Sequence, residues 1–480
     1  MLLTSAFHIQ KSVRQGCPLS PLLYILSLEP LLVNIRQDNS IKGLYIPNTV
    51  GKKILAYADD TTFLVQTEKA IQTVIEKFNN FGKGSGGKIN AEKSKVMGIG
   101  KWKGKDNYHI DITITDKLKI YGITYTSDPT INDQETWTTL KNKINHNLEK
   151  YQYCNTTIFA RAALVNRYII PKIIFVATNS TIPNSFIKKT NKHIREFIFK
   201  NTIRNISHKT LIQNKLNGGI GLHDIQTKIN TFRLKHLDRI RIEPHYHPLA
   251  QYYIGLNIKS ILKLNIITPH YGGNDIGSFY KETLATFQGN KSIIGEDTQK
   301  IYDILIKQQA TPFYTRISWA REHNIIDIKD TFRNLHNKRI TPKEREIAYR
   351  LIFNTTPVSR NTKSNQNVKI TCQTCKQNIQ ETEKHIYLDC ILVQKTKQTL
   401  AKILNTTNQT ATTNKAITLN LINTTRQRTE DENRLVAMAI YRSTIWQIRN
   451  KVRYFFTKYT DIELKEILQA KLRHRLGTLT

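Results

Sequence analysis

The sequence predicts an α+β protein, with a mixed N-terminal region followed by a longer, mainly helical remainder. Two observations favour this class. Residues 52–65 place short apolar runs on both sides of an acidic pair, which is the pattern of a β-hairpin. From Trp137 to Phe199, apolar residues recur at helical spacing. We find no repeat with a period of roughly 20 to 50 residues, which argues against a solenoid.

The first region should contain a helix, the hairpin, a second helix and two short strands. Ser20 followed by Pro21 is a typical helix start, cap and then first-turn proline. Beyond the hairpin, a helical apolar pattern leads to Gly82, which is placed to end the second helix. We expect the strands around residues 96–99 and 119–125.

Helical patterns continue downstream, weakly, to about residue 355. Two polar stretches of low complexity, residues 361–367 and 405–414, are predicted to be linkers. A last helix is expected from about residue 433 to residue 458.

The charge of the chain favours a polyanionic partner, and nucleic acid above all. Lys and Arg number 72 against 37 Asp and Glu, so the net charge is +35. Residues 1–130 carry +6 of it and residues 131–480 carry +29, which assigns most of the binding surface to the downstream part. Arg442, Arg449 and Arg453 follow one stripe of the last predicted helix. For that stripe, phosphate contact and a merely solvated face are both open.

The sequence also indicates a compartment. It has no apolar stretch of roughly 18 residues that could span a membrane. Residues 1–10 lack the basic and apolar regions of a secretory signal. Five cysteines in 480 residues do not form a disulfide framework, so a reducing environment fits better. We expect an intracellular protein, nuclear or cytoplasmic, that is neither secreted nor membrane-bound.

The tip of the predicted hairpin, Tyr57-Ala58-Asp59-Asp60, is the first candidate site. Adjacent side chains on a strand point to opposite faces, so two neighbouring carboxylates can serve one metal centre only where the chain turns. Aspartates are also common in turns without any function, and the tetrapeptide alone leaves both readings open.

The second candidate site is a cluster of cysteine and histidine residues with the spacing Cys372-x2-Cys375-x9-His385-x4-Cys390. Three thiolates and one imidazole satisfy the tetrahedral preference of Zn²⁺ and leave no position open for a substrate. The alternative is a set of scattered buried thiols. We therefore expect a structural Zn²⁺ that stabilises a small, polar segment with little core of its own.

Several segments, in their order and spacing, resemble the reverse transcriptases of non-LTR (LINE-type) retrotransposons. The palm motifs B, C, D and E are matched by residues 7–24, 57–60, 85–94 and 119–123, and the string RQGCPLSP at residues 14–21 is highly specific. Looser matches to the thumb occur at residues 159–168 and 217–222, and residues 445–450 resemble the C-terminal end of the family. The Cys-His spacing resembles the C-terminal CCHC motif of the same family.

The resemblance implies an enzyme that copies an RNA template into DNA by extending a DNA primer at a two-Mg²⁺ centre. It implies no small-molecule cofactor beyond the nucleotides. Asp59 matches the Mg²⁺ ligand of motif C, Asp60 its less directly coordinating neighbour, and Lys93 a lysine that acts on the leaving pyrophosphate. A solvated lysine at a helix end is the structural alternative for Lys93.

The residues that meet template and incoming nucleotide in the family are matched by Arg14, Gln15, Gly16 and Tyr57. For the first three, a capped turn entering a core helix is the structural alternative, and both readings can hold together. The resemblance divides the chain into five segments: a partial palm (1–128), a helical thumb-like region (129–240), a helical connector (241–360), a zinc module (361–395) and a basic helical end (396–480).

Motif A, which supplies the other metal-binding aspartate of the family, would precede motif B. Only six residues stand before Phe7, and none of them is acidic. We therefore expect a truncated or incomplete reverse transcriptase with little or no polymerase activity by itself. The alternative is a non-catalytic remnant that binds nucleic acid through its basic thumb and zinc module.

Overall fold

The computed structural model divides the chain into two compact units. One consists of residues 1–136 and 234–289, and the other of residues 137–233 and 290–480. The structure describes residues 16–45, 51–105, 108, 110–127, 129–200, 206–243, 278–309, 317–358, 371–375, 377–405, 410–422 and 427–477. The predicted linker at residues 361–367 lies outside them. The five-segment division of the sequence stays a prediction.

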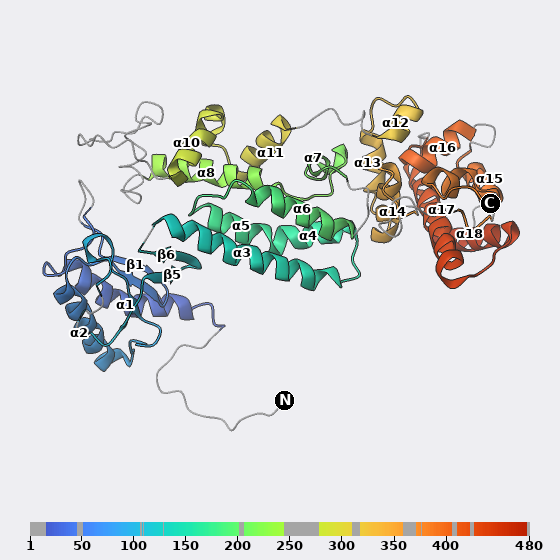
Figure 1. Ribbon diagram of the computed structural model, residues 1–480. Helices are drawn as coiled ribbons and strands as arrows, with labels where there is room; N and C mark the ends of the chain where they lie inside the picture. Colours follow the sequence, from blue (N-terminus) through green and yellow to red (C-terminus); the bar gives the residue numbers. More distant parts are fainter. Residues whose placement is uncertain are drawn as a thin grey trace, which may run out of the picture. The chain divides into compact units, whose positions relative to one another are not determined.

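The first unit is built around the predicted hairpin, β1 (Ile54–Tyr57) and β2 (Asp60–Phe63). Helices α1 (Ser20–Gln37) and α2 (Glu68–Ser85) pack against each other beside it (Figure 1). Their shared core contains one residue of the hairpin and seven others: Ile54 with Leu28, Leu31, Leu32, Ile35, Ile41, Ala70 and Val74. The hairpin is thereby fixed to both helices.

Two further strand pairs complete the described sheet structure of this unit. β3 (Lys95–Val96) pairs in parallel with β4 (Thr113–Ile114), and β5 (Lys117–Ile120) pairs antiparallel with β6 (Ile123–Thr126). The prediction of one strand over residues 119–125 is wrong. The chain reverses at Tyr121 and Gly122, whose φ angles of 50° and 83° belong to the two-residue turn typical of hairpins.

Both expected helix boundaries in this unit need correction. Ser20 is the first residue of α1 rather than its cap, although Pro21 stands in the first turn as predicted. Gly82 does not end α2, which continues for three residues to Ser85. Gly86 ends it instead, in the left-handed conformation, and donates its N–H to the Gly82 carbonyl at 2.8 Å.

Helices dominate the second unit. Helix α3 (Pro129–Gln152) enters it from the first unit, α8 (Ile225–Ile242) leaves it, and α10 (Ser278–Gln288) belongs to the first. The other α-helices of the second unit are α4 (Ile158–Tyr168), α5 (Ile170–Ala177), α6 (Phe186–Phe199), α7 (His208–Leu211), α11 (Thr298–Gln308), α12 (Ser318–Glu322), α13 (Lys329–Leu335), α14 (Pro342–Ile352), α15 (Gln394–Ile403), α16 (Thr410–Leu419), α17 (Arg428–Phe455) and α18 (Asp461–Leu476). The predicted α+β class is confirmed.

Sequence patterns missed parts of the C-terminal helices. α16 begins at Thr410, so the expected linker at residues 405–414 is half helical. α17 starts five residues before the expected start at 433 and ends at Phe455. α18 was not expected as a separate helix. It begins with a capping box, in which Thr460 and Glu463 each bind the other's backbone N–H.

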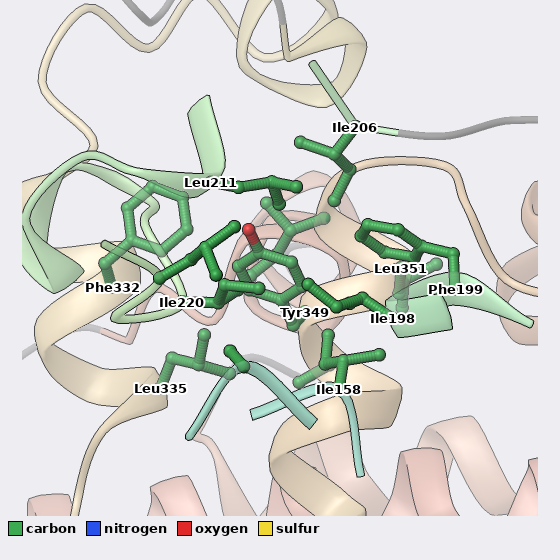
Figure 2. Packing of buried hydrophobic residues seen from close by; sticks show 14 of the residues in the cluster. Ile158, Ile198, Phe199, Ile206, Leu211, Ile220, Phe332, Leu335, Tyr349 and Leu351 are labelled. Carbon is green, nitrogen blue, oxygen red and sulfur yellow. The ribbon is translucent and has the colours of Figure 1, made fainter. Parts of the chain in front are cut away.

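One hydrophobic core runs through the second unit and joins segments far apart in the sequence. Figure 2 shows Tyr349 of α14 with Ile158 of α4, Ile198 of α6 and Leu335 of α13 around it. The Tyr349 hydroxyl donates to the Gly218 carbonyl at 2.7 Å, which satisfies the one polar atom of this buried ring. Thumb-like and C-terminal segments therefore share a single core.

Among the described residues, no helix is both long enough and apolar enough to cross a bilayer.

Candidate polymerase hairpin and Cys-His centre

The hairpin places the acidic pair at an exposed turn. Tyr57 pairs with Asp60 in register, which leaves Ala58 and Asp59 as the two loop residues. Ala58 takes a φ of 53°, a conformation that residues with a Cβ adopt only at a cost in free energy. Asp59 and Asp60 are both exposed. The acidic pair thus lies where the chain turns, as two neighbouring carboxylates must if they are to serve one metal centre.

Two other elements of the first unit reach this tip. The ring of Tyr121, in the β5–β6 turn, meets Tyr57 edge-on with 5.6 Å between centroids. Burial raises the pKa of Tyr121, and the neighbouring Asp60 and Tyr57 raise it further. Burial also raises the pKa of Tyr24 on α1, with a smaller contribution from the negative charge of Asp59. The segments that resemble motifs B, C and E are thus brought together.

For the remaining residues of the predicted polymerase site, the structure shows no contact with the hairpin tip among the described residues. Lys93 lies in an exposed turn, where its backbone N–H donates to the Asn90 side chain at 3.1 Å. Gly16, with a φ of 88°, stands in a turn four residues before α1. Arg14 and Gln15 lie outside the described residues. The roles expected for these four residues stay predictions.

The hairpin tip does not by itself fit a pair of divalent ions. Two Mg²⁺ ions held a few ångströms apart require several oxygen ligands, and in the family that the motifs resemble these include an aspartate of motif A beside that of motif C. Within the part of the chain that the structure describes, the Cys-His cluster is the group that gathers at least three potential metal ligands. Asp59 and Asp60 are not in such a group, and we derive no catalytic step through Mg²⁺.

The predicted Cys-His cluster does assemble. The ligand atoms of Cys372, Cys375, His385 and Cys390 all lie within 4.8 Å of one another. The first two stand on a loop that closes when the Cys372 N–H donates to the Ile379 carbonyl at 2.8 Å. A single helical turn joins the other two, and the Cys390 N–H donates to the His385 carbonyl at 2.7 Å.

The chemistry of these donors suits a borderline-soft ion such as Zn²⁺. Hydrogen bonding from Cys390 lowers the pKa of the Cys372 thiol, with help from the backbone N–H groups of Cys375 and Thr374. Cys372, His385 and Cys390 are buried and Cys375 is half-buried, so the centre is largely enclosed. An enclosed set of four donors fits a structural ion, because a catalytic ion needs an open position.

Helix α17 binds the segment that carries this cluster through ion pairs and a hydrogen bond. Glu381, 1% exposed, forms ion pairs with Arg449 and with Arg453, the second at 3.1 Å. Tyr441 donates its hydroxyl to the Tyr387 carbonyl at 2.7 Å. The residues that these contacts join are separated by 54 to 72 positions in the sequence.

For the arginine stripe of α17, the sequence left open phosphate contact and a solvated face. Both predictions are wrong for two of the three arginines. Arg442 is 1% exposed and donates to the Asn420 side chain at 2.6 Å. Arg449 is 3% exposed and pairs with Glu381. Periodicity located the stripe correctly, but the buried partners that hold these charges inside lie on other elements and give no local signal.

Comparison with known proteins agrees with the hairpin and its neighbours. The family described as reverse transcriptase (RNA-dependent DNA polymerase) matches residues 3–125. The retrovirus-related Pol polyprotein of the type-1 retrotransposable element R2 from Popillia japonica is 24% identical over 273 residues, 52% of this chain and 35% of that protein. That of the type-2 element R2DM from Drosophila melanogaster is 23% identical over 247 residues, 48% of this chain and 22% of that protein.

A third relative is the transposon TX1 uncharacterized 149 kDa protein of Xenopus laevis, 25% identical over 301 residues, 59% of this chain and 23% of that protein. The aligned part of the chain spans about a third or less of each relative's length. The chain carries a reverse transcriptase domain of the non-LTR retrotransposon type. The resemblance stated from the motifs is therefore confirmed, and the truncation stays a prediction.

Downstream of this reverse transcriptase domain, the two thumb-like strings prove to contact each other. Asn166 donates to the Gly221 carbonyl at 2.7 Å and accepts the His223 N–H at 2.9 Å. Gly219 packs so closely on the chain that an added Cβ would lie 1.6 Å from the Gln213 carbonyl oxygen. These residues therefore serve the fold of the second unit.

Arg161, in the first of these strings, is a buried cation that acts as a helix cap. It is 1% exposed. Its guanidinium donates to the carbonyls of Phe197 at 2.6 Å and of Gln152 and Cys154 at 3.0 Å each. Two of these carbonyls belong to the last turns of α3 and α6, where helices leave acceptors without partners. Its position within a helical motif did not reveal this role.

Proposed function

We propose that the chain binds an RNA template and a DNA primer but does not polymerise by itself. The observation that carries the proposal is the small number of acidic ligands. The hairpin tip supplies Asp59 and Asp60, and neither belongs to a group of three potential metal ligands among the described residues. By resemblance to the family, an aspartate of motif A would complete the ligands of the two Mg²⁺ ions.

In this proposal the residues matched by family motifs keep their roles. Asp59 is a Mg²⁺ ligand, Asp60 its partner, and Lys93 the cation for the pyrophosphate. Tyr57, Arg14, Gln15 and Gly16 contact the template or the incoming nucleotide. The convergence of α1 and the β5–β6 turn on the hairpin tip supports this assignment, because in one unit it gathers segments that resemble separate polymerase motifs.

Primer extension on an RNA template tests the proposal. The purified chain, supplied with Mg²⁺ or Mn²⁺ and all four nucleotides, should extend the primer no further than its Asp59→Asn variant does. The asparagine keeps the size of the side chain and removes its charge, so the comparison isolates the carboxylate. Extension by the unmodified chain that disappears in the variant would contradict the proposal.

We further propose that the Cys-His cluster binds one structural Zn²⁺ through Cys372, Cys375, His385 and Cys390. The close approach of four donors and the enclosure of two of them support this choice. When bound, the ion supplies four strong bonds that hold two short segments together.

A second candidate function is that of a nucleic-acid-binding protein without any catalytic role. It is favoured by the charge of +29 carried by residues 131–480, which does not depend on the hairpin. The two candidates differ in one respect. A polymerase part becomes active when a strand carrying an aspartate is supplied to face Asp59, whereas a binding remnant does not.

A further inference from the structure

Helix α17 ends in three consecutive aromatic residues that face solvent. Tyr454 is 60% exposed, Phe455 76% and Phe456 86%. Phe456 stands in the left-handed conformation, with a φ of 55°, and ends the helix. Side chains of this size are usually buried, so an exposed group of them on a folded surface indicates a binding site. We call these three residues the aromatic tip.

The surroundings of the aromatic tip are basic. Residues 447–460 contain Arg449, Lys451, Arg453 and Lys458 and no acidic residue. Arg449 and Arg453 are paired with Glu381, which leaves the charges of Lys451 and Lys458 for a ligand. The Arg453 guanidinium lies 5.8 Å from the centroid of the Tyr454 ring. Lys451 and Lys458 are exposed on either side of the tip. An anionic ligand with flat, stackable groups matches both features of this surface.

A cleft of about 440 Å³ opens on the same helix, between α14, α17 and α18. Its lining includes Lys471, His474 and Arg475 of α18. Arg475 is ion-paired with Glu344, while the Lys471 ammonium donates to the Gln447 side chain at 2.7 Å. The hydroxyl oxygen of Thr444, a fully buried residue in this lining, has no hydrogen-bond partner in the described structure.

The cleft and the aromatic tip lie along one face of α17. Ser443 and Gln447 line the cleft, and Lys451 and Phe455 continue the same four-residue spacing to the tip. Gln447 and Phe455 are separated by about 12 Å along the helix axis, a length that accommodates two or three nucleotides of a single strand. Lys451 also lies near enough to Lys471 for its charge to lower the pKa of that ammonium, after the larger effect of burial.

We propose that this face of α17 binds single-stranded nucleic acid, with phosphates at the cleft and unpaired bases stacked on the aromatic tip. A protein partner is disfavoured because Lys451 and Lys458 flank the three aromatic rings and residues 447–460 carry no acidic residue. The one carboxylate in the cleft lining, that of Glu344, is paired with Arg475. The inference extends the proposed binding of nucleic acid to a named surface. It does not depend on the polymerase hairpin, because no nucleotide incorporation enters its test.

Binding of a fluorescent oligouridine by the full chain tests the aromatic tip. The double variant Phe455→Leu/Phe456→Leu keeps apolar side chains and removes the rings. It should weaken binding roughly tenfold for each stacked base lost, with an unchanged dependence on salt. Tyr153→Leu is the matched control, since Tyr153 is an aromatic residue of the same unit that is 83% exposed. It should bind as the unmodified chain does.

The cleft is tested by the salt dependence. Lys451→Gln/Lys471→Gln should reduce the slope of log K against log salt by about 1 to 1.5, because each cation that neutralises a phosphate of a single strand contributes about 0.7. In the Lys451→Gln/Lys471→Gln variant, an oligonucleotide that contains the photoreactive base 4-thiouridine should cross-link to the peptide with residues 454–456.

Three outcomes overturn the inference. The inference is wrong if the cross-links map only to peptides that lack residues 454–456. This holds even if other basic surfaces supply most of the total affinity. Unchanged affinity and salt slope in both double variants would overturn it as well. Loss of self-association in the aromatic double variant, with binding of oligouridine unaltered, would assign the surface to a second copy of the chain. The variants alter exposed or cleft residues, and thermal unfolding of each one checks that it is folded.

Discussion

At the scale of single residues, buried arginines and a histidine contribute to the stability of the second unit. Arg161 satisfies helix-end carbonyls, Arg442 holds the Asn420 side chain, and Arg449 pairs with Glu381. Each guanidinium is buried, so removal of any one leaves carbonyl, amide or carboxylate oxygens without the hydrogen bonds that it supplied. Part of the positive charge of the chain is thus structural and cannot contact nucleic acid.

Replacement of Arg161 by methionine, which has a similar reach and no donors, should lower the free energy of unfolding by about 3 to 5 kcal/mol. The loss comes from carbonyls of Phe197, Gln152 and Cys154 that are left unpaired. Urea denaturation followed by circular dichroism measures it. Arg167→Met provides the control on the same helix, because Arg167 is exposed. Equal stability of the two variants would refute the capping role.

His336 should make the second unit sensitive to acid. Burial, followed by the charges of Arg345 and Lys215, lowers its pKa from 6.5 to about 4. A lowered histidine pKa means that the unfolded chain takes up the proton first, so stability is lost as the pH falls from 6.5 towards 4. Between neutral pH and about pH 4.5 the loss should be about 2 to 3 kcal/mol.

The variant His336→Phe removes the titrating group and keeps an aromatic ring beside Phe159, whose centroid lies 5.7 Å from the His336 ring. Its stability should fall less steeply with decreasing pH than that of the unmodified chain. Denaturation curves at several pH values give both slopes. Parallel slopes would show that His336 already accepts a proton in the folded protein.

At the scale of elements, the sequence predicted those helices and strands whose residues follow a local pattern. The hairpin at residues 54–63 and helix α1 followed from apolar spacing and from an acidic turn. The end of α2 was misplaced because two glycines, Gly82 and Gly86, both suit a helix terminus, and only the chain that follows decides between them. α18 was missed although Thr460 and Glu463 carry a capping pattern that could have revealed it.

The candidate sites divide in the same way. Cys372, Cys375, His385 and Cys390 were found from spacing alone, because short loops bring close neighbours in the sequence together. The burial of Arg449 could not be foreseen, since its partner Glu381 is 68 residues away. The same holds for the contact of Tyr121 with Tyr57, which joins two hairpins.

Metal removal should show how far the Cys-His module and α17 depend on each other. Cys372 and Cys390 belong to the same core cluster as Leu435 and Tyr441 of α17. Loss of a bound ion should therefore destabilise the unit by several kcal/mol and lower its Tm by roughly 10 °C or more. Purified protein should contain about one Zn²⁺ per chain.

Elemental analysis and calorimetry before and after treatment with a chelator measure both quantities. Cys154→Ser is the control for thiol chemistry, since Cys154 is an exposed cysteine outside the cluster. Cys390→Ser should reproduce the effect of the chelator and Cys154→Ser should not. A zinc content near zero, with a Tm indifferent to the chelator, would remove the proposed ion.

At the scale of the whole molecule, the two units have different parts in the proposed function. The first holds the reverse transcriptase hairpin with its two exposed carboxylates, and the second a helical body with an enclosed Cys-His centre and the basic α17 face. The proposed binding of nucleic acid draws on the second unit, whereas chemistry depends on ligands at the first. In the proposed function, the second unit holds the template, and the chain copies it only when further ligands complete the site at Asp59.

The most direct measurement is primer extension by the chain alone and by a mixture with a polypeptide that carries the upstream half of a non-LTR palm. We expect no extension by the chain alone. In the mixture we expect extension that Asp59→Asn abolishes, because the added strand completes the metal site. Extension by the isolated chain that depends on Asp59 would show that the proposed function is wrong.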